Sequence, residues 1–137
     1  MNLIPAPSTP AYLRLVRASA WYDLVITAAF ATPWTYELVH AAVLDGDVHA
    51  VDPMQILYAN LMGSVVLVWA TLRLTRTQPE FGLYDGVARL LFSTWFAYAL
   101  SQGAPGVLWL FLVVELPFGI IQLAPWRGRV RRVRQAA

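Results

Sequence analysis

The chain carries four long apolar stretches, and their lengths constrain the fold more than any other feature of the sequence. They run over about residues 19–44, 54–74, 83–101 and 105–124. A helix of about 20 residues crosses a hydrocarbon core of about 30 Å, because each residue adds about 1.5 Å of rise. We therefore expect an all-α membrane protein, with residues 1–137 forming a single domain built as a four-transmembrane-helix up-down bundle.

The composition agrees with a membrane location and excludes several kinds of site. Of the 137 residues, 58% are hydrophobic and 13% are charged, and the mean hydropathy is +0.54. The chain is therefore more apolar, and carries fewer charged residues, than a typical soluble domain. The sequence has no cysteine, which excludes disulfides, thiolate metal ligands and cysteine nucleophiles. We expect no cofactor and no metal site.

The distribution of arginine predicts the orientation in the membrane. Arginines surround the four stretches at these positions: Arg14, Arg17, Arg73, Arg76, Arg127, Arg129, Arg131, Arg132 and Arg134. All of them fall on one side if the chain crosses four times, and the opposite side carries Asp45, Asp47 and Asp52. Positively charged loops stay in the cytoplasm, so both termini are expected there, in a bacterial inner membrane. The basic tail over 125–137 is expected to lie on anionic lipid rather than to bind nucleic acid.

Ionisable residues inside the apolar stretches are the strongest indication of function. They are Asp23, Glu37, Asp85, Arg89 and Glu115. A charge placed in the hydrocarbon costs about 2.5–3.5 kcal/mol on insertion scales and marks a polar site or an internal pair. Because the polar residues recur at helical spacing, we expect one polar stripe per helix, directed away from lipid.

Three of these residues form a predicted ion pair. Asp85 and Arg89 are four residues apart, which places them one turn apart on one helix face. Glu115 lies on the next stretch, and the tight turn at 102–104 makes the two helices antiparallel neighbours. We expect Arg89 to pair with Glu115 and Asp85 inside the membrane. Two interpretations stay open: the charges lock the helix register, or they form a proton-handling or ligand-binding site.

A second polar group lies toward the opposite side of the membrane. Glu37 and His40 are three residues apart on one helix, and Asn60 falls at a similar depth on the next. The group is either an interfacial polar fringe, an acid/base or proton-relay pair, or part of a metal site. If the chain is an enzyme, Glu37, His40 and Asp23 are the candidate catalytic residues.

Two tryptophans complete the candidate ligand site. Trp34 and Trp95 fall deeper than the aromatic belts expected at the membrane surfaces, so we expect them to line an interior together with Glu37, Asn60 and Glu115. Small residues at a spacing of four predict close helix contacts, either within the chain or between copies. The two pairs are Ala59 with Gly63 and Gly82 with Gly86.

Short segments of the chain resemble those of small uncharacterised bacterial four-span membrane proteins. These segments are Trp21-Tyr22-Asp23, Asp52-Pro53, Phe81-Gly82-Leu83-Tyr84-Asp85-Gly86 and Glu115-Leu116-Pro117-Phe118. The layout is also distantly similar to the EXPERA group, through Pro33 and Glu37 in the first stretch, the Asp-Pro pair, and Leu-Pro-Phe in the fourth. That resemblance implies a four-helix membrane protein related to sterol isomerases and ligand-binding proteins, although the group's acid in the second span is Asn60 here.

Three functions follow as expectations. The first is an inner-membrane protein that binds a lipid-like or hydrophobic small molecule in a polar intramembrane cavity. The second is an accessory subunit of a larger membrane complex, whose partners are membrane lipids, a partner subunit or further copies of the chain. The third is an intramembrane lipid isomerase or cyclase. The direction of the polar stripes in the structure discriminates among them.

Overall fold

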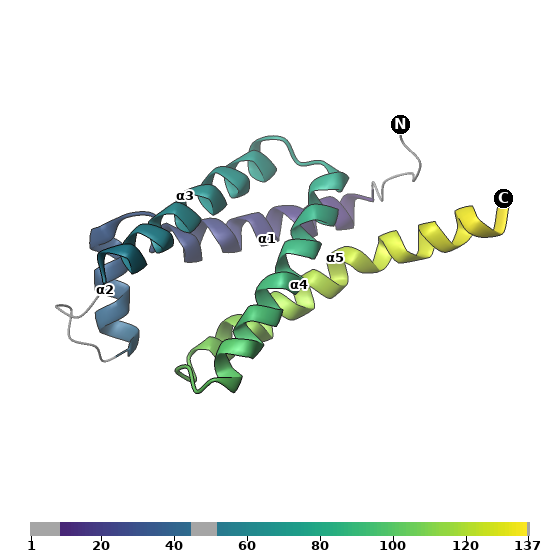
Figure 1. Ribbon diagram of the computed structural model, residues 1–137. Helices are drawn as coiled ribbons and strands as arrows, with labels where there is room; N and C mark the ends of the chain where they lie inside the picture. The colour runs from purple at the N-terminus through teal and green to yellow at the C-terminus, as the bar shows by residue number, and fades with distance from the viewer. Residues whose placement is uncertain (1–8, 45–51, 137) are drawn as a thin grey trace. The chain divides into compact units, whose positions relative to one another are not determined.

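The described part of the chain is entirely helical. The computed structural model describes residues 9–44 and 52–136, and in this part no strand occurs. The helices are α1 (Pro10–Ala28), α2 (Pro33–Leu44), α3 (Pro53–Thr75), α4 (Pro79–Ser101) and α5 (Leu108–Ala136) (Figure 1). The all-α class predicted from the sequence is confirmed.

The stretch over 19–44, expected as one span, contains the end of α1 and all of α2, because the chain breaks between these two helices. Proline has no N–H and its ring clashes with the preceding turn, so a helix rarely continues through it. Here α1 ends at Ala28 and α2 begins at Pro33, which stands at the first helical position that suits proline. Thr32 caps the new helix, since its Oγ1 accepts a hydrogen bond of 3.3 Å from the amide of Thr35.

The later helices extend beyond the predicted stretches. Asp52 caps α3, accepting a hydrogen bond of 2.7 Å from the Met54 amide, as the Asp-Pro pair suggests. α4 begins at Pro79, four residues before the predicted 83–101 stretch. α5 continues to Ala136 and includes Pro117 and Pro125 within the helix. The basic segment predicted as a separate tail over 125–137 is therefore helical as far as residue 136.

Two described helices are long and apolar enough to cross a membrane, namely Pro53–Thr75 and Leu108–Arg127. The other expected crossings differ from them in length or charge. α2 has 12 residues, which span only about 18 Å at the helical rise. α4 has 23 residues but contains Glu80, Asp85 and Arg89. Of the four predicted crossings, this test therefore supports the two formed by α3 and α5.

The chain divides into two compact units. The first comprises residues 1–16 and 77–137, and the second comprises residues 17–76. The boundary crosses α1 after Val16, so the start of that helix belongs with α4 and α5. In the first unit α4 and α5 form an antiparallel hairpin (Figure 1). Gly103 turns the chain between them with a φ of 85°, a conformation that glycine adopts without strain.

Glycine allows close helix contacts in both units. A Cβ added to Gly86 would lie 2.8 Å from the Leu123 side chain, and one added to Gly119 would lie 3.2 Å from the carbonyl oxygen of Gly86. In the second unit, a Cβ added to Gly63 would lie 2.6 Å from the main chain of Phe30. Gly63 and Gly86, which the sequence marks as contact residues, therefore serve packing within the chain.

We expect Gly63→Ala to lower the free energy of unfolding by about 1–3 kcal/mol, because the new methyl group would overlap main-chain atoms. Thermal unfolding of the purified protein in detergent measures this loss. Gly106→Ala is the matched control, since no atom lies within 4 Å of its added Cβ. Equal unfolding midpoints for the two variants would contradict the close contact at Phe30.

Candidate functional site

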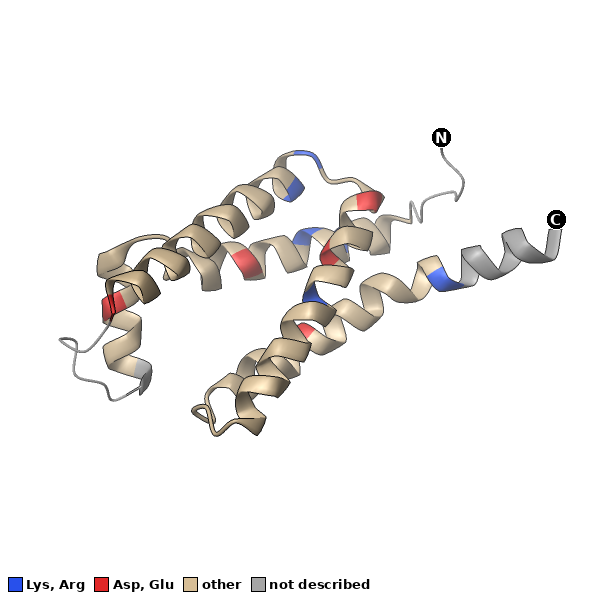
Figure 2. Cartoon of the chain, in the orientation of Figure 1, with Lys and Arg blue, Asp and Glu red and all other residues tan. Residues whose placement is uncertain are grey.

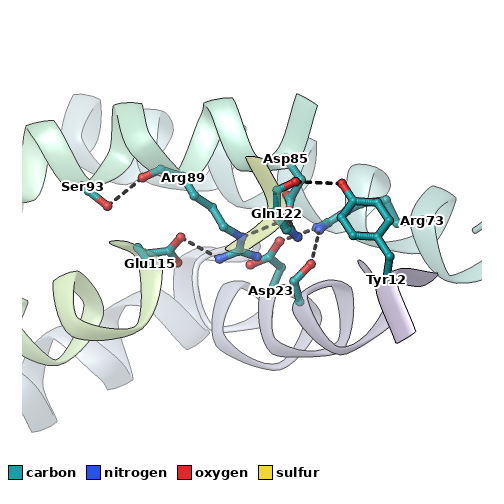
Figure 3. Close-up of polar contacts among 9 residues, drawn as sticks. Tyr12, Asp23, Arg73, Asp85, Arg89, Ser93, Glu115 and Gln122 are labelled. Atoms are coloured by element: carbon teal, nitrogen blue, oxygen red, sulfur yellow. Dashed lines mark hydrogen bonds and ion pairs between the residues drawn. The ribbon is translucent and has the colours of Figure 1, made fainter. Parts of the chain in front are cut away.

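A buried ion cluster joins α4 to α5 in the first unit. The Arg89 guanidinium donates from Nε to Asp85 Oδ2 at 2.9 Å and from Nη1 to Glu115 Oε2 at 2.6 Å (Figure 3). The exposed fractions of Asp85, Arg89 and Glu115 are 3%, 2% and 7%. The buried ion pair predicted from these three residues is therefore confirmed.

Further groups surround the same guanidinium and its carboxylates. Gln122 donates from Nε2 to Asp85 Oδ2 at 2.8 Å, so this one oxygen receives hydrogen bonds from two helices. The face of the Phe118 ring lies 5.0 Å from the central carbon of the Arg89 guanidinium, a distance at which ring and cation attract each other. The cluster is therefore held in place by polar and aromatic contacts.

Tyr12 links the start of α1 to α5 beside this cluster. Its hydroxyl donates to the main-chain oxygen of Gln122 at 3.0 Å and accepts from Nε1 of Trp126 at 2.9 Å. Burial raises the pKa of the Tyr12 hydroxyl, so it keeps the proton that it donates. Together Tyr12, Trp126 and Val16 form the buried apolar core of the first unit. No pattern in the sequence indicates this link, because it joins residues 110 positions apart.

The second unit contains its own buried ion pair, between α3 and α1. Arg73 donates from Nη2 to Asp23 Oδ2 and from Nη1 to Ser19 Oγ at 3.1 Å. The Arg73 guanidinium also lies 5.4 Å from the centre of the Trp69 ring. The sequence analysis counts Arg73 with the arginines that follow the second stretch, whereas the structure places it, fully buried, in the last turn of α3. Asp23, a candidate catalytic residue, is the carboxylate of this pair.

The pairs Arg73–Asp23 and Arg89–Glu115 bring together opposite charges from different helices, and Asp85 adds a second carboxylate to Arg89. Figure 2 shows the acidic and basic residues as red and blue bands along the helices. Moving such groups out of water is costly, and the cost is offset only when each charge has a partner with good geometry. The ion pairs hold α3 against α1 and α4 against α5. In them the carboxylates of Asp23 and Glu115 bind arginine side chains.

The remaining polar candidates lie on α2 and α3. Glu37 and His40 are half-buried on α2, and Asn60 is half-buried on α3. Nδ1 of His40 and Oδ1 of Asn60 are buried atoms with no hydrogen-bond partner among residues 9–44 and 52–136. Within residues 9–44 and 52–136, no group of three or more histidine, aspartate or glutamate side chains could hold a metal ion.

Trp34 and Trp95, which the sequence predicts to line an interior, are 77% and 65% exposed in the described part of the chain. The break before Pro33 resets the helical phase, so Trp34 no longer follows the stripe that begins at Asp23. On α4 the buried face runs through Arg89 and Ser93, and Trp95 lies two residues beyond Ser93, about 200° around the helix. Trp95 therefore lies on another face of α4 than Arg89 and Ser93.

Comparisons of the chain with family models, with curated proteins and with solved structures found no match. The interpretation of the site consequently rests on the contacts of its own residues.

We expect Glu115→Gln to lower the free energy of unfolding by about 1.5–3 kcal/mol, because the Arg89 guanidinium loses the charged acceptor of one buried hydrogen bond and keeps Asp85 as its counter-ion. Asp85→Asn should cause a loss of similar size. Thermal and denaturant unfolding in detergent measures both.

Glu80→Gln is the matched control, since Glu80 lies exposed in the first turn of the same helix and should change stability by less than about 1 kcal/mol. If Glu115→Gln were as stable as this control, the ion pair would contribute nothing to the fold.

Proposed function

We propose that the chain is an integral protein of the bacterial inner membrane, crossing it four times with both termini in the cytoplasm, that binds a lipid-like or hydrophobic small molecule. The observation that supports a membrane location best is the inverted polarity of the fold. The charged side chains of the ion pairs are buried inside the units, and many large apolar side chains are exposed.

The exposed fractions make this inversion quantitative. On α3, Val65 and Val68 are 69% and 71% exposed, whereas Arg73 is fully buried. In water the reverse holds, because arginine is almost never fully buried and valine usually is. Only 11% and 17% of the most apolar windows of α3 and α5 are buried within the chain. The core helix of a soluble protein would be mostly buried, so these helices suit a lipid environment.

The break between α1 and α2 is compatible with one crossing formed by both helices. Non-helical backbone is tolerated at membrane depth only where protein covers it. The main chain at Phe30 and Ala31 lies directly against Gly63 of α3, and it makes turn hydrogen bonds to Thr27 and Ala28 at 2.9 and 3.3 Å. The polar groups of the break are therefore covered.

The ligand-binding role rests on where the remaining polar groups lie. Asp23 and Glu115 are engaged by arginines, which disfavours them as the acids of an isomerase or cyclase. An enzyme would then depend on Glu37 with His40. The buried atoms without partners on His40 and Asn60 instead favour α2 and α3 as the region that binds a molecule from the membrane.

A second candidate function, an accessory subunit or a homo-oligomer, is favoured by the outer face of α4. Tyr84, Leu91, Trp95 and Tyr98 recur there at helical spacing, and each is between 56% and 65% exposed. Tyrosine and tryptophan are enriched where proteins contact one another. In this alternative the stripe packs against another chain instead of lipid.

The absence of cysteine from the sequence allows a direct test of topology with single introduced cysteines. We expect Asp52→Cys and Gln102→Cys to react with a membrane-impermeant maleimide added outside spheroplasts, and Gln78→Cys to react only after lysis. All three positions are exposed. The reverse pattern, or reaction of all three from outside, would contradict the proposed orientation.

Native purification followed by mass spectrometry of lipids and proteins separates the two candidate functions. We expect a defined hydrophobic molecule to co-purify in stoichiometric amount with the single chain. A stable co-purifying subunit, with no such molecule, would favour the accessory role. Replacing Trp95 and Tyr98 with leucine should release a subunit but leave a bound small molecule in place.

A further inference from the structure

One exposed face of α1 carries basic residues at one end and apolar residues at the other. Arg14, Arg17, Trp21 and Val25 follow one another at steps of three and four residues, so they lie on one face of the helix. Trp21 is 55% exposed and Val25 is 69% exposed, and both arginines are exposed as well. These four residues are named the α1 stripe.

The two arginines of the α1 stripe carry positive charges that no carboxylate balances within residues 9–44 and 52–136. They differ in this respect from the buried Arg73 and Arg89, which pair with acidic residues. Residues three apart on a helix have neighbouring side chains, so Arg14 and Arg17 can contact the same anion. The guanidinium group suits phosphate in particular, because it offers N–H donors in a planar fork.

The length of the α1 stripe matches one leaflet of a bilayer. From Arg17 to Val25 the helix rises about 12 Å, and half of the hydrocarbon core is about 15 Å thick. Arginine is attracted to anionic headgroups, and tryptophan is enriched where headgroups meet hydrocarbon. The order arginine, tryptophan, valine along α1 is therefore the order of the phosphate, the interfacial region and the acyl chains of a phospholipid.

α4 presents a comparable face with the opposite charge. Glu80, Tyr84, Val87 and Leu91 recur there at the same helical spacing, with Glu80 in the first turn, and all four are exposed. An acid at the level of the headgroups repels an anionic lipid. The two faces are alike in their aromatic and apolar residues, so the charge at the end of each face decides which lipid it suits.

We propose that the α1 stripe binds an anionic phospholipid of the cytoplasmic leaflet. The lipid phosphate contacts Arg14 and Arg17, and the acyl chains lie along Trp21 and Val25. This inference rests on the membrane location and orientation proposed above. It concerns an outer face of the chain and is separate from the molecule proposed to bind at α2 and α3.

The test uses the full chain with a fluorophore on a single introduced cysteine, Val25→Cys, which the absence of native cysteine makes specific. The protein is placed in nanodiscs of equal parts phosphatidylglycerol and phosphatidylcholine. One of the two lipids carries bromine atoms on its acyl chains, which quench a fluorophore that they contact. Brominated phosphatidylglycerol should quench more strongly, with a relative association constant about tenfold above that of phosphatidylcholine.

The matched control places the same fluorophore at Val87→Cys, on the α4 face that begins with Glu80. The two positions lie at similar distances from the charged end of their faces. At Val87→Cys, brominated phosphatidylglycerol should quench no more strongly than brominated phosphatidylcholine.

Two further variants show which arginines matter. Replacing Arg14 and Arg17 together with glutamine should abolish the lipid preference at Val25→Cys. Arg76→Gln removes an exposed arginine outside the α1 stripe and should leave the preference in place. Where the double variant fails to fold, salt serves instead: high salt should weaken the preference of the chain with both arginines, because it screens exposed charges.

Equal quenching by the two lipids at Val25→Cys would overturn the inference. An equal preference at Val87→Cys, or a preference that survives the loss of both arginines or is unchanged by salt, would overturn it as well, because the attraction would then not belong to the α1 stripe. Quenching by neither lipid at either position would contradict the proposed membrane location itself. The binding of a molecule at α2 and α3 is judged separately, by co-purification.

Discussion

The Arg89 guanidinium is the group on which the arrangement of the first unit depends. Its bonds to Asp85 and Glu115 connect two helices whose outer surfaces are almost wholly apolar. At the proposed location in a membrane, the hydrophobic effect does not hold helices together, so close packing and polar contacts between helices take its place. Gly86 and Gly119 let α4 and α5 approach closely, and this approach brings Glu115 within reach of Arg89. Glycine packing and ion pairing thus require each other.

The second unit also holds two helices together through a buried arginine, but with different residues. Arg73 pairs with Asp23 and lies against Trp69, as Arg89 pairs with Glu115 and lies against Phe118. In each unit an arginine, a carboxylate from another helix and an aromatic ring form one buried group. Burying a complete pair costs far less than burying one charge. Both arginines therefore stabilise the fold. The polar groups that remain for binding or catalysis are the half-buried ones of α2 and α3.

Several features of the site follow from the sequence, and others do not. Asp85 and Arg89 are four residues apart, and a tight turn brings Glu115 alongside, so local rules predict this pair. The pair of Arg73 with Asp23 escapes such rules, because an arginine at the end of an apolar stretch looks like a loop residue until its burial is known. The break before Pro33 also escapes such rules, because it separates the stretch over 19–44 into two helices whose faces are no longer in phase.

The sequence by itself determined that the chain is helical, where α3 begins, and that charges inside its apolar stretches must find partners. These properties depend on residues close together in the chain, through helical rise, capping and the cost of an unpaired charge in lipid. Only the tertiary structure decided which arginine meets which carboxylate, that Tyr12 reaches α5, and that His40 and Asn60 are left with buried atoms unpaired. Such contacts join residues that are distant in sequence, so they exist only once the helices have packed.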